Sequence, residues 1–359
     1  GTRTLLQILH NEQGKLPKGT ARDYPLFPNR GFMLDVARKF FTMDYLKQYV
    51  KILSFYKMNE FQIHLNDNGF PQFFGDDWNR TYAAFRLESE RFPGLTAKDG
   101  SYSKQEFIDL QRMGLEYGVR IIPEIDIPAH SLAFAHYKPE IASRKYGMDH
   151  LDLYKKETYQ FVDSLLDEYL SGDNPVFIGD LHIGTDEYNK KEAEQYRYFT
   201  DRYLKFVEKY GKNVRMWGGL KWLPGKTPVK AEGVTVNAWS YDWVDPVVSL
   251  QDGYKLINTC DTYLYIVPAA GYYRDFLDHQ WIYEKWSPWI MNRKQTLPEG
   301  TPGVLGGMFA VWNDKCGNGI SEQDVHLRSF PAMQVLAEKL WKGENKNVTY
   351  EAFAKLCKT

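Results

Sequence analysis

Short apolar runs alternate with amphipathic segments along most of the chain. Eight runs rich in β-branched or apolar residues predict strands, at Gly31–Ala37, Glu60–Asn66, Arg120–Asp126, Leu181–Glu187, Val214–Gly218, Val234–Ser240, Leu256–Asp261 and Val304–Asn313. Several are nearly continuous hydrophobic stretches, as expected for strands covered on both faces of a parallel sheet. The pattern therefore predicts repeated βα units.

Helical segments with one apolar face lie between most of these runs. The predicted helices are Asp44–Tyr56, Lys104–Tyr117, Glu157–Leu170, Lys191–Tyr210 and Glu322–Trp341. The connections around Pro224 and Pro246 are short for full helices. We therefore expect the fifth and sixth helices to be reduced or missing.

Eight strand–helix units in a chain of 359 residues match the size of a (β/α)8 TIM barrel. A doubly wound open sheet is the rival fold. No Gly-rich phosphate-binding turn follows the first strand, however, and eight similar units favour closure. We expect an α/β protein with a TIM barrel over residues 21–359 and some reduced helices. An amphipathic helix over Thr2–His10 is expected to lie outside that barrel.

Composition excludes some classes of partner. Lys and Arg total 45 against 46 Asp and Glu, so charge gives no case for a nucleic acid or an anionic membrane. No apolar run approaches the ~20 residues of a membrane span. The 3 cysteines predict neither a disulfide framework nor a metal cluster. Aromatic residues reach 16%, which suits stacking on sugar rings, although large barrels also use many aromatics in their cores.

Polar residues gather where the predicted strands end. In a TIM barrel the carboxyl ends of the strands carry the chemistry. Here the second, third, fourth and eighth strands end in His64-Leu-Asn-Asp67-Asn, Asp126-Ile-Pro-Ala-His130, Asp186-Glu187 and Trp312-Asn-Asp314.

Asp186 and Glu187 are adjacent acids at the end of an otherwise apolar strand. Burying two neighbouring carboxylates is costly unless one is protonated or paired, so the pair predicts pKa values pushed apart. A general acid needs such a shift at near-neutral pH. The alternative is a helix N-cap followed by an acid in the first turn.

Neighbouring strand ends would also bring Asp67, His130 and Glu187 together. Such a carboxylate–imidazole–carboxylate chain could tune the acid. A histidine near a proline is more often structural. A metal site built from His64, Asp67, Asp126 and His130 is the competing use, but the spacing fits no tight metal-binding motif.

Several candidate binding residues stand close to predicted strand termini. Arg30 directly precedes the first strand, where a guanidinium could fork onto vicinal hydroxyls or form a surface salt bridge. Trp217, Trp239 and Trp312 each lie at the end of a different strand. Three indoles at one barrel mouth favour a stacking pocket over three separate core positions.

With these motifs the sequence resembles glycoside hydrolase family 20, the β-N-acetylhexosaminidases and lacto-N-biosidases, over nearly its whole length. Each motif alone is moderately specific, and all five in order at barrel-compatible spacing are strong evidence. The matching stretches are Arg30-Gly-Phe-Met-Leu-Asp-Val-Ala-Arg, Phe61-Gln-Ile-His-Leu-Asn-Asp, Pro123-Glu-Ile-Asp-Ile-Pro-Ala-His, His182-Ile-Gly-Thr-Asp-Glu and Phe309-Ala-Val-Trp-Asn-Asp.

The resemblance implies substrate-assisted catalysis, an exception to the usual scheme of two catalytic carboxylates. It makes Glu187 the general acid/base. Asp186 would hold the acetamido N–H and stabilise an oxazolinium-like intermediate, and Tyr263 would contact the acetamido oxygen. The remaining site residues would act around these: the relay of Asp67 and His130, the enclosing indoles Trp217, Trp239 and Trp312, and the hydroxyl-binding pair Arg30 and Asp314.

Two positions depart from common family members. Many have Tyr-Leu-Asp after strand seven where this chain has Tyr263-Leu264-Tyr265, and Asp314 replaces a frequent Glu. Both changes lie where hydroxyls are read, so they bear on epimer preference and on tolerance of an added sugar. The segment 82–89 is closer to the surface-enzyme and lacto-N-biosidase branch, which points to host glycans or milk-type oligosaccharides.

The resemblance predicts a retaining exo-enzyme that releases terminal β-linked N-acetylglucosamine from a glycan, without metal or organic cofactor. One alternative is a lacto-N-biosidase that releases galactosyl-N-acetylglucosamine, with an extra subsite built by Phe70–Ser103. Another is an inactive sugar-binding barrel, against which the intact acid pair argues. We also expect residues 1–20 to be a remnant or linker from a preceding small α/β domain, and the location to be extracellular or cell-surface.

Overall fold

Eight parallel strands form a closed barrel in the computed structural model, which describes residues 1–357. All eight predicted strands are present, and the TIM barrel is confirmed. Pairing of the last strand with the first closes the sheet. In barrel order the strands are β1 (Asn29–Asp35), β2 (Glu60–His64), β5 (Arg120–Ile127), β8 (Leu181–Gly184), β9 (Val214–Trp217), β10 (Val234–Ala238), β11 (Lys255–Asn258) and β13 (Val304–Val311).

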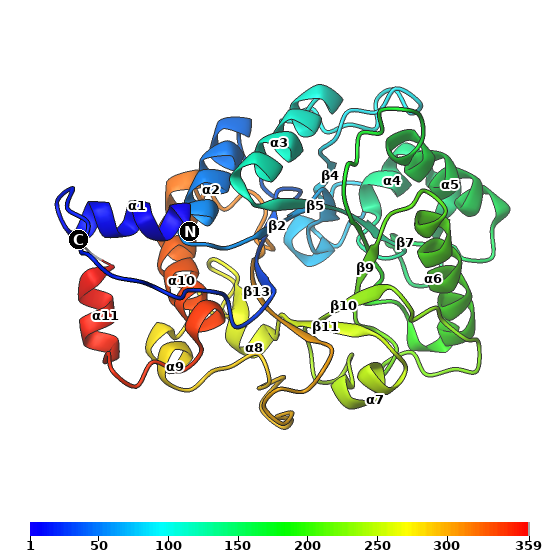
Figure 1. Ribbon diagram of the computed structural model, residues 1–359. Coiled ribbons are helices and arrows are strands. Elements are labelled where there is room, and N and C mark those ends of the chain that lie inside the picture. Colours follow the sequence, from blue (N-terminus) through cyan, green and yellow to red (C-terminus); the bar gives the residue numbers. More distant parts are fainter. Residues whose placement is uncertain (358–359) are drawn as a thin grey trace.

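Helices surround the barrel unevenly (Figure 1). The five predicted long helices are confirmed as α2 (Met43–Phe55), α3 (Lys104–Tyr117), α5 (Lys156–Leu170), α6 (Ala193–Glu208) and α10 (Glu322–Lys342). Capping boxes start two of them, with Ser103 and Glu106 at α3 and Ser321 and Asp324 at α10. Within residues 1–357, no helix lies between β9 and β10, and only the six-residue α7 (Pro246–Gln251) follows β10. The expected reduction of helices five and six is therefore confirmed.

The connections at the carboxyl ends of the strands hold small elements of their own. After β2 the chain forms β3 (Asn66–Asn68), the 3-10 turn η1 (Pro71–Phe74) and β4 (Ala83–Phe85). After β5 come α4 (Leu132–Tyr137), η2 (Pro139–Ile141), β6 (Ala142–Ser143) and β7 (Gly147–Leu151), and η3 (Lys190–Glu192) precedes α6. Between β11 and β13 lie α8 (Asp261–Leu264), β12 (Tyr265–Ile266) and α9 (His279–Glu284). These connections build the walls of the barrel mouth.

The two ends of the described chain lie on one side of the barrel, near α10 (Figure 1). The helix predicted over Thr2–His10 is present as α1 (Thr2–Asn11), and Arg3 donates a hydrogen bond to Ser54 on α2 at 2.9 Å. The last described helix is α11 (Tyr350–Leu356), which contacts α9. Among the described residues, no helix has both the length and the apolarity to span a membrane.

Aromatic side chains pack between the barrel and α2, where Tyr49 lies 5.4 Å from Phe32, and paired charges lie at the amino ends of the strands. Phe32 stacks between Phe61 and Phe309 with ring centroids 5.2 and 4.6 Å away. At the amino ends of the strands, Arg215 binds Glu60 through 2.7 and 2.8 Å contacts, so charges buried there are paired. This end is closed, which leaves the opposite mouth for chemistry.

Candidate active site

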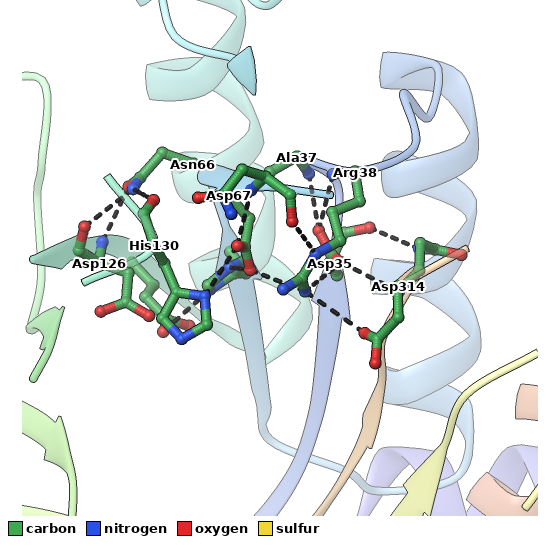
Figure 2. Close-up of polar contacts among 12 residues, drawn as sticks. Asp35, Ala37, Arg38, Asn66, Asp67, Asp126, His130 and Asp314 are labelled. Carbon is green, nitrogen blue, oxygen red and sulfur yellow. Dashed lines mark hydrogen bonds and ion pairs between the residues drawn. The ribbon is translucent and has the colours of Figure 1, made fainter. Parts of the chain in front are cut away.

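Polar side chains from several strand ends converge at the mouth of the barrel (Figure 2). His130 lies between two acids: its Nδ1 is 2.9 Å from Asp67 Oδ1, and its Nε2 is 3.2 Å from Glu187 Oε2. Burial disfavours a charged imidazole, but Asp67 and Asp126 hold the pKa of His130 well above its usual value. The three residues thus form a continuous path for a proton from the buried Asp67 to the exposed Glu187.

Asp186 is a buried acid with an unused oxygen. Asp186 is only 7% exposed, and its Oδ1 has no hydrogen-bond partner among residues 1–357. Burial, together with the negative charges of Glu187 and Glu124, raises the pKa of Asp186 to about 7. An unpartnered buried carboxylate at a barrel mouth is well placed to accept an N–H from a ligand.

The two adjacent acids have opposite shifts. Although burial alone would raise it, the pKa of Glu187 is lowered by a hydrogen bond and the charge of His130. The predicted separation of pKa values is therefore present, but Asp186 is the acid that keeps a proton at higher pH. Thr185 and Glu187 both have positive φ, at +72° and +50°, and such backbone strain clusters at functional sites.

Arg38 binds three acids at the mouth. Its Nη1 lies 2.7 Å from Asp67, 3.2 Å from Asp35 and 3.5 Å from Asp314 (Figure 2). Asp314 also accepts a hydrogen bond from the Tyr272 hydroxyl at 2.8 Å. Arg38 follows the carboxyl end of β1, where site residues of this fold belong.

The prediction for Arg30 is wrong. Arg30 is the second residue of β1 and lies at the opposite end of the barrel. Its guanidinium donates to the backbone oxygens of Phe27 at 2.6 Å and Lys57 at 2.8 Å, and it lies over the Trp341 ring. The side chain is therefore engaged in fixing the closed end, and Arg38 is the arginine that pairs with Asp314.

The prediction for Tyr263 is also contradicted by the geometry. Tyr263 lies on α8 and stacks on Trp281 with ring centroids 4.3 Å apart, away from the acid pair. Tyr265, two residues later on β12, is 5% exposed, and its ring lies 5.8 Å from Trp312. Burial first, and then neighbouring groups that include Asp186 and Glu187, raise the pKa of Tyr265 well above its usual value. Tyr265 therefore faces the acids.

The three predicted tryptophans lie together at the mouth. Trp217 and Trp312 have ring centroids 5.6 Å apart, and Trp217 donates to Glu124 at 2.6 Å. Trp239 is 6% exposed and donates to the Gly218 oxygen at 2.8 Å. Hydrogen bonds that fix two indoles below the surface give the mouth a rigid apolar wall.

Two clusters at the mouth have the spacing of metal ligands. Ligand atoms of His64, Glu124 and Asp126 lie within 4.8 Å of one another, and so do those of Asp126, His130 and Asp186. Both ring nitrogens of His130 already face carboxylates. Although burial opposes it, Glu124 and Asp67 hold the pKa of His64 well above its usual value. A protonated imidazole offers no lone pair to a metal, so the arrangement favours proton handling.

Comparison with known proteins places this chain in one family. A model of the glycosyl hydrolase family 20 catalytic domain matches residues 27–344. The beta-hexosaminidase subunit B2 of Dictyostelium discoideum is 27% identical over 93% of this chain and 60% of its own length. A beta-hexosaminidase of Akkermansia muciniphila is 28% identical over 67% of this chain and 54% of its own. The chain thus spans little more than half the length of these relatives.

Solved structures agree on the fold. The beta-N-acetylhexosaminidase of Bacteroides fragilis has a TM-score of 0.73 at 22% identity, over 94% of this chain and 70% of its own. An exo beta-N-acetylglucosaminidase of Vibrio harveyi has a TM-score of 0.75 at 20% identity, over 99% of this chain and 61% of its own. Because the family model covers most of the barrel, including every strand end described above, the chain belongs to glycosyl hydrolase family 20.

Proposed function

We propose that the protein is a retaining exo-β-N-acetylhexosaminidase that releases terminal β-linked N-acetylglucosamine by substrate-assisted catalysis. The observation that carries this proposal is the buried Asp186 carboxyl with an unpartnered oxygen, beside Glu187 and within a tryptophan-lined mouth. An acetamido N–H of the sugar would supply the missing hydrogen bond. The names of the relatives, which are beta-hexosaminidases, support the same activity.

In the first step, protonated Glu187 donates its proton to the glycosidic oxygen as the bond from that oxygen to C1 breaks. The acetamido carbonyl oxygen forms a bond to C1 from the opposite face, which gives a cyclic oxazolinium ion. The Asp186 carboxylate accepts a hydrogen bond from the nitrogen and offsets its positive charge. In the second step, Glu187 takes a proton from water as the water oxygen attacks C1 and the ring reopens. Two inversions at C1 give net retention.

The remaining residues position the sugar. The hydroxyls farthest from C1 would lie against Arg38 and Asp314, which are 3.5 Å apart. The indoles of Trp217, Trp239 and Trp312 would enclose the acetamido methyl and support the ring. His130 and Asp67 would supply and withdraw charge at Glu187 through their shared hydrogen bonds.

We expect Arg38→Lys to lower kcat/KM on p-nitrophenyl N-acetylglucosaminide by roughly 10- to 100-fold, because it removes hydrogen bonds from a charged, planar donor. The matched variant Arg30→Lys should keep kcat/KM and change only the melting temperature, since Arg30 contacts backbone at the closed end. Steady-state kinetics and thermal melting of both variants test this pair. A loss of kcat/KM in Arg30→Lys at unchanged melting temperature would contradict our placement of the site.

Tyr265 is proposed to hold the acetamido oxygen as it turns toward C1. Tyr265→Phe should lower kcat about tenfold, the size expected for one hydrogen bond to a group that gains charge. Tyr263→Phe serves as the control and should leave kcat unchanged, because the ring stacking on Trp281 is retained. Equal effects of the two variants would refute the assignment of Tyr265.

A lacto-N-biosidase remains a second candidate because a cavity of about 320 Å³ lies on the other side of Arg38. Phe74, Tyr82 and Asp99, all from the segment 70–103, line it together with Cys316. A second sugar attached beyond the terminal N-acetylhexosamine could lie there.

One assay separates the two candidates. The enzyme is given p-nitrophenyl N-acetylglucosaminide and, in parallel, the p-nitrophenyl glycoside of galactosyl-β-1,3-N-acetylglucosamine. Hydrolysis of the monosaccharide glycoside with retention of configuration, followed by NMR, is the expected result. Hydrolysis of the disaccharide glycoside alone would replace our first candidate by the second, and hydrolysis of neither would refute both.

A further inference from the structure

An open groove of about 630 Å³ lies on the outer side of Glu187. It is lined by Tyr146 and His150 from the β6–β7 hairpin, by Lys190 and Lys191 from η3, and by Trp222 and Trp243. Glu187 belongs to its wall, and His150 Nε2 lies 3.2 Å from the Glu187 backbone oxygen. The groove is therefore continuous with the acid that would protonate the leaving group, and it lies where the next sugar of a substrate would extend.

The charges around this groove do not balance. Glu187 faces His130, and Glu192 below the hairpin binds Lys145 at 2.7 Å and accepts hydrogen bonds from the hydroxyls of Tyr146 and Tyr154. Within residues 1–357, neither Lys190 nor Lys191 forms an ion pair with an acid. The acids of the groove are thus already engaged while two ammonium groups keep free donors, so the groove attracts anions.

Aromatic side chains lead into the groove from the mouth. The Trp239 and Trp243 ring centroids lie 5.5 Å apart, and those of Trp243 and Trp222 lie 5.1 Å apart. Trp222 is 36% exposed, and Lys190 Nζ lies 4.8 Å from its ring centroid. Indoles beside an ammonium offer both an apolar surface for a pyranose ring and a cation for a charged substituent on that ring.

We infer that the groove selects an acidic sugar as the leaving group, namely a hexuronic acid to which the terminal N-acetylhexosamine is β-linked. The hexuronate ring would lie along Trp222 and Trp243, and its carboxylate would accept hydrogen bonds from Lys190 and Lys191. A uronic acid fits because its carboxylate is attached directly to the ring and cannot lie far from the stacking surface. This inference rests on the proposed hydrolase activity and names the class of substrate for it.

The test compares an oligosaccharide whose terminal N-acetylglucosamine is β-linked to glucuronic acid with the same compound after its carboxylates are reduced to neutral glucose. We expect the acidic form to be hydrolysed with about tenfold higher kcat/KM at low ionic strength, as two partly exposed ion pairs supply. The preference should shrink with added salt, because exposed charges are screened. Lys190→Gln and Lys191→Gln should each lower the ratio about twofold to fivefold.

The matched control is Lys209→Gln, which removes a positive charge at the far end of α6 and should leave the ratio unchanged. Equal kcat/KM for the acidic and reduced compounds would overturn the inference, while hydrolysis of p-nitrophenyl N-acetylglucosaminide in the same preparation would leave the proposed function standing. If that glycoside is not hydrolysed, the proposed function fails. Calorimetric binding of the two oligosaccharides to Glu187→Gln then decides the inference alone, and equal affinities would refute it.

Discussion

Glu187→Gln is expected to lower kcat/KM on an N-acetylglucosaminyl oligosaccharide by roughly 10²- to 10⁴-fold, the contribution of a positioned general acid. The amide has the size of the carboxyl group but donates no acidic proton to the leaving oxygen. His130 would still hold the side chain at the 3.2 Å contact, so the loss would report chemistry more than geometry. Steady-state kinetics with an alkyl or sugar leaving group measure this effect.

Leaving-group ability provides the internal control for that prediction. A 2,4-dinitrophenyl glycoside departs without protonation, so its first step should be nearly unaffected by Glu187→Gln. Glu157→Gln, an exposed acid in the first turn of α5, should behave as wild type on both substrates. If Glu187→Gln lost the same factor on the dinitrophenyl and the sugar substrate, Glu187 would not be the acid.

The strands and the tryptophans could be predicted because both depend on local pattern. A buried parallel strand needs a continuous apolar run, and the eight runs of this chain are all strands. Trp217, Trp239 and Trp312 end or follow such runs, so their arrangement at one mouth follows from closure of the barrel. The relay of Asp67 and His130 followed from the same reasoning, and its distances of 2.9 and 3.2 Å fit the predicted role.

Arg30 and Tyr263 were misplaced because each depends on which end of an element a side chain occupies. Arg30 lies at the amino end of β1, whereas Arg38 lies beyond its carboxyl end. That rule of barrel chemistry could have selected Arg38 from the sequence. Tyr265 could not be selected this way. The four-residue helix α8 and the two-residue strand β12 turn Tyr263 outward and Tyr265 inward, and such short elements leave no periodic signal.

For the acid pair, the sequence alone does not show which of the two pKa values is raised. Adjacent buried carboxylates predict divergent pKa values, but the neighbours decide which one rises. His130 lies against Glu187 and lowers the pKa of that carboxyl, while Asp186 lacks a partner and keeps a pKa of about 7. Catalysis as proposed needs the reverse, with Glu187 protonated and Asp186 ionised. An acetamido N–H bound to Asp186 would favour the carboxylate there and let the proton of the coupled pair move to Glu187.

Asp186→Asn is accordingly expected to lower kcat by roughly 10²- to 10³-fold, as when a group that stabilises a charged transition state is removed. The variant should also lose selectivity. Wild-type enzyme should strongly prefer the N-acetylglucosaminide over the plain glucoside, because only the former carries the nucleophile. Once a neutral amide replaces the carboxylate of Asp186, that preference should fall by a similar factor.

The pH dependence of kcat/KM tests the role of Asp186 most directly. The pair is active with one proton, which moves from Asp186 to Glu187 when the sugar binds, so wild-type kcat/KM should fall as the pH rises above about 7, where the free enzyme loses that proton. Asp186→Asn should move this limb to lower pH, because the remaining proton is then held by Glu187, whose pKa His130 lowers. A variant that kept the wild-type rate or the wild-type limb of kcat/KM near pH 7 would refute substrate assistance through this residue.

The melting temperature of Asp186→Asn distinguishes a loss of activity caused by the missing carboxylate from one caused by misfolding. The pKa of Asp186 is higher in the folded protein than the usual 3.8, so its contribution to stability is full below that value and is lost as the pH rises through about 7. An asparagine side chain cannot ionise and escapes that loss. Asp186→Asn should therefore melt at a higher temperature than wild type at pH 8 while being far less active. Higher stability with lower activity is expected, because the Asp186 carboxylate destabilises the folded protein but is needed for catalysis.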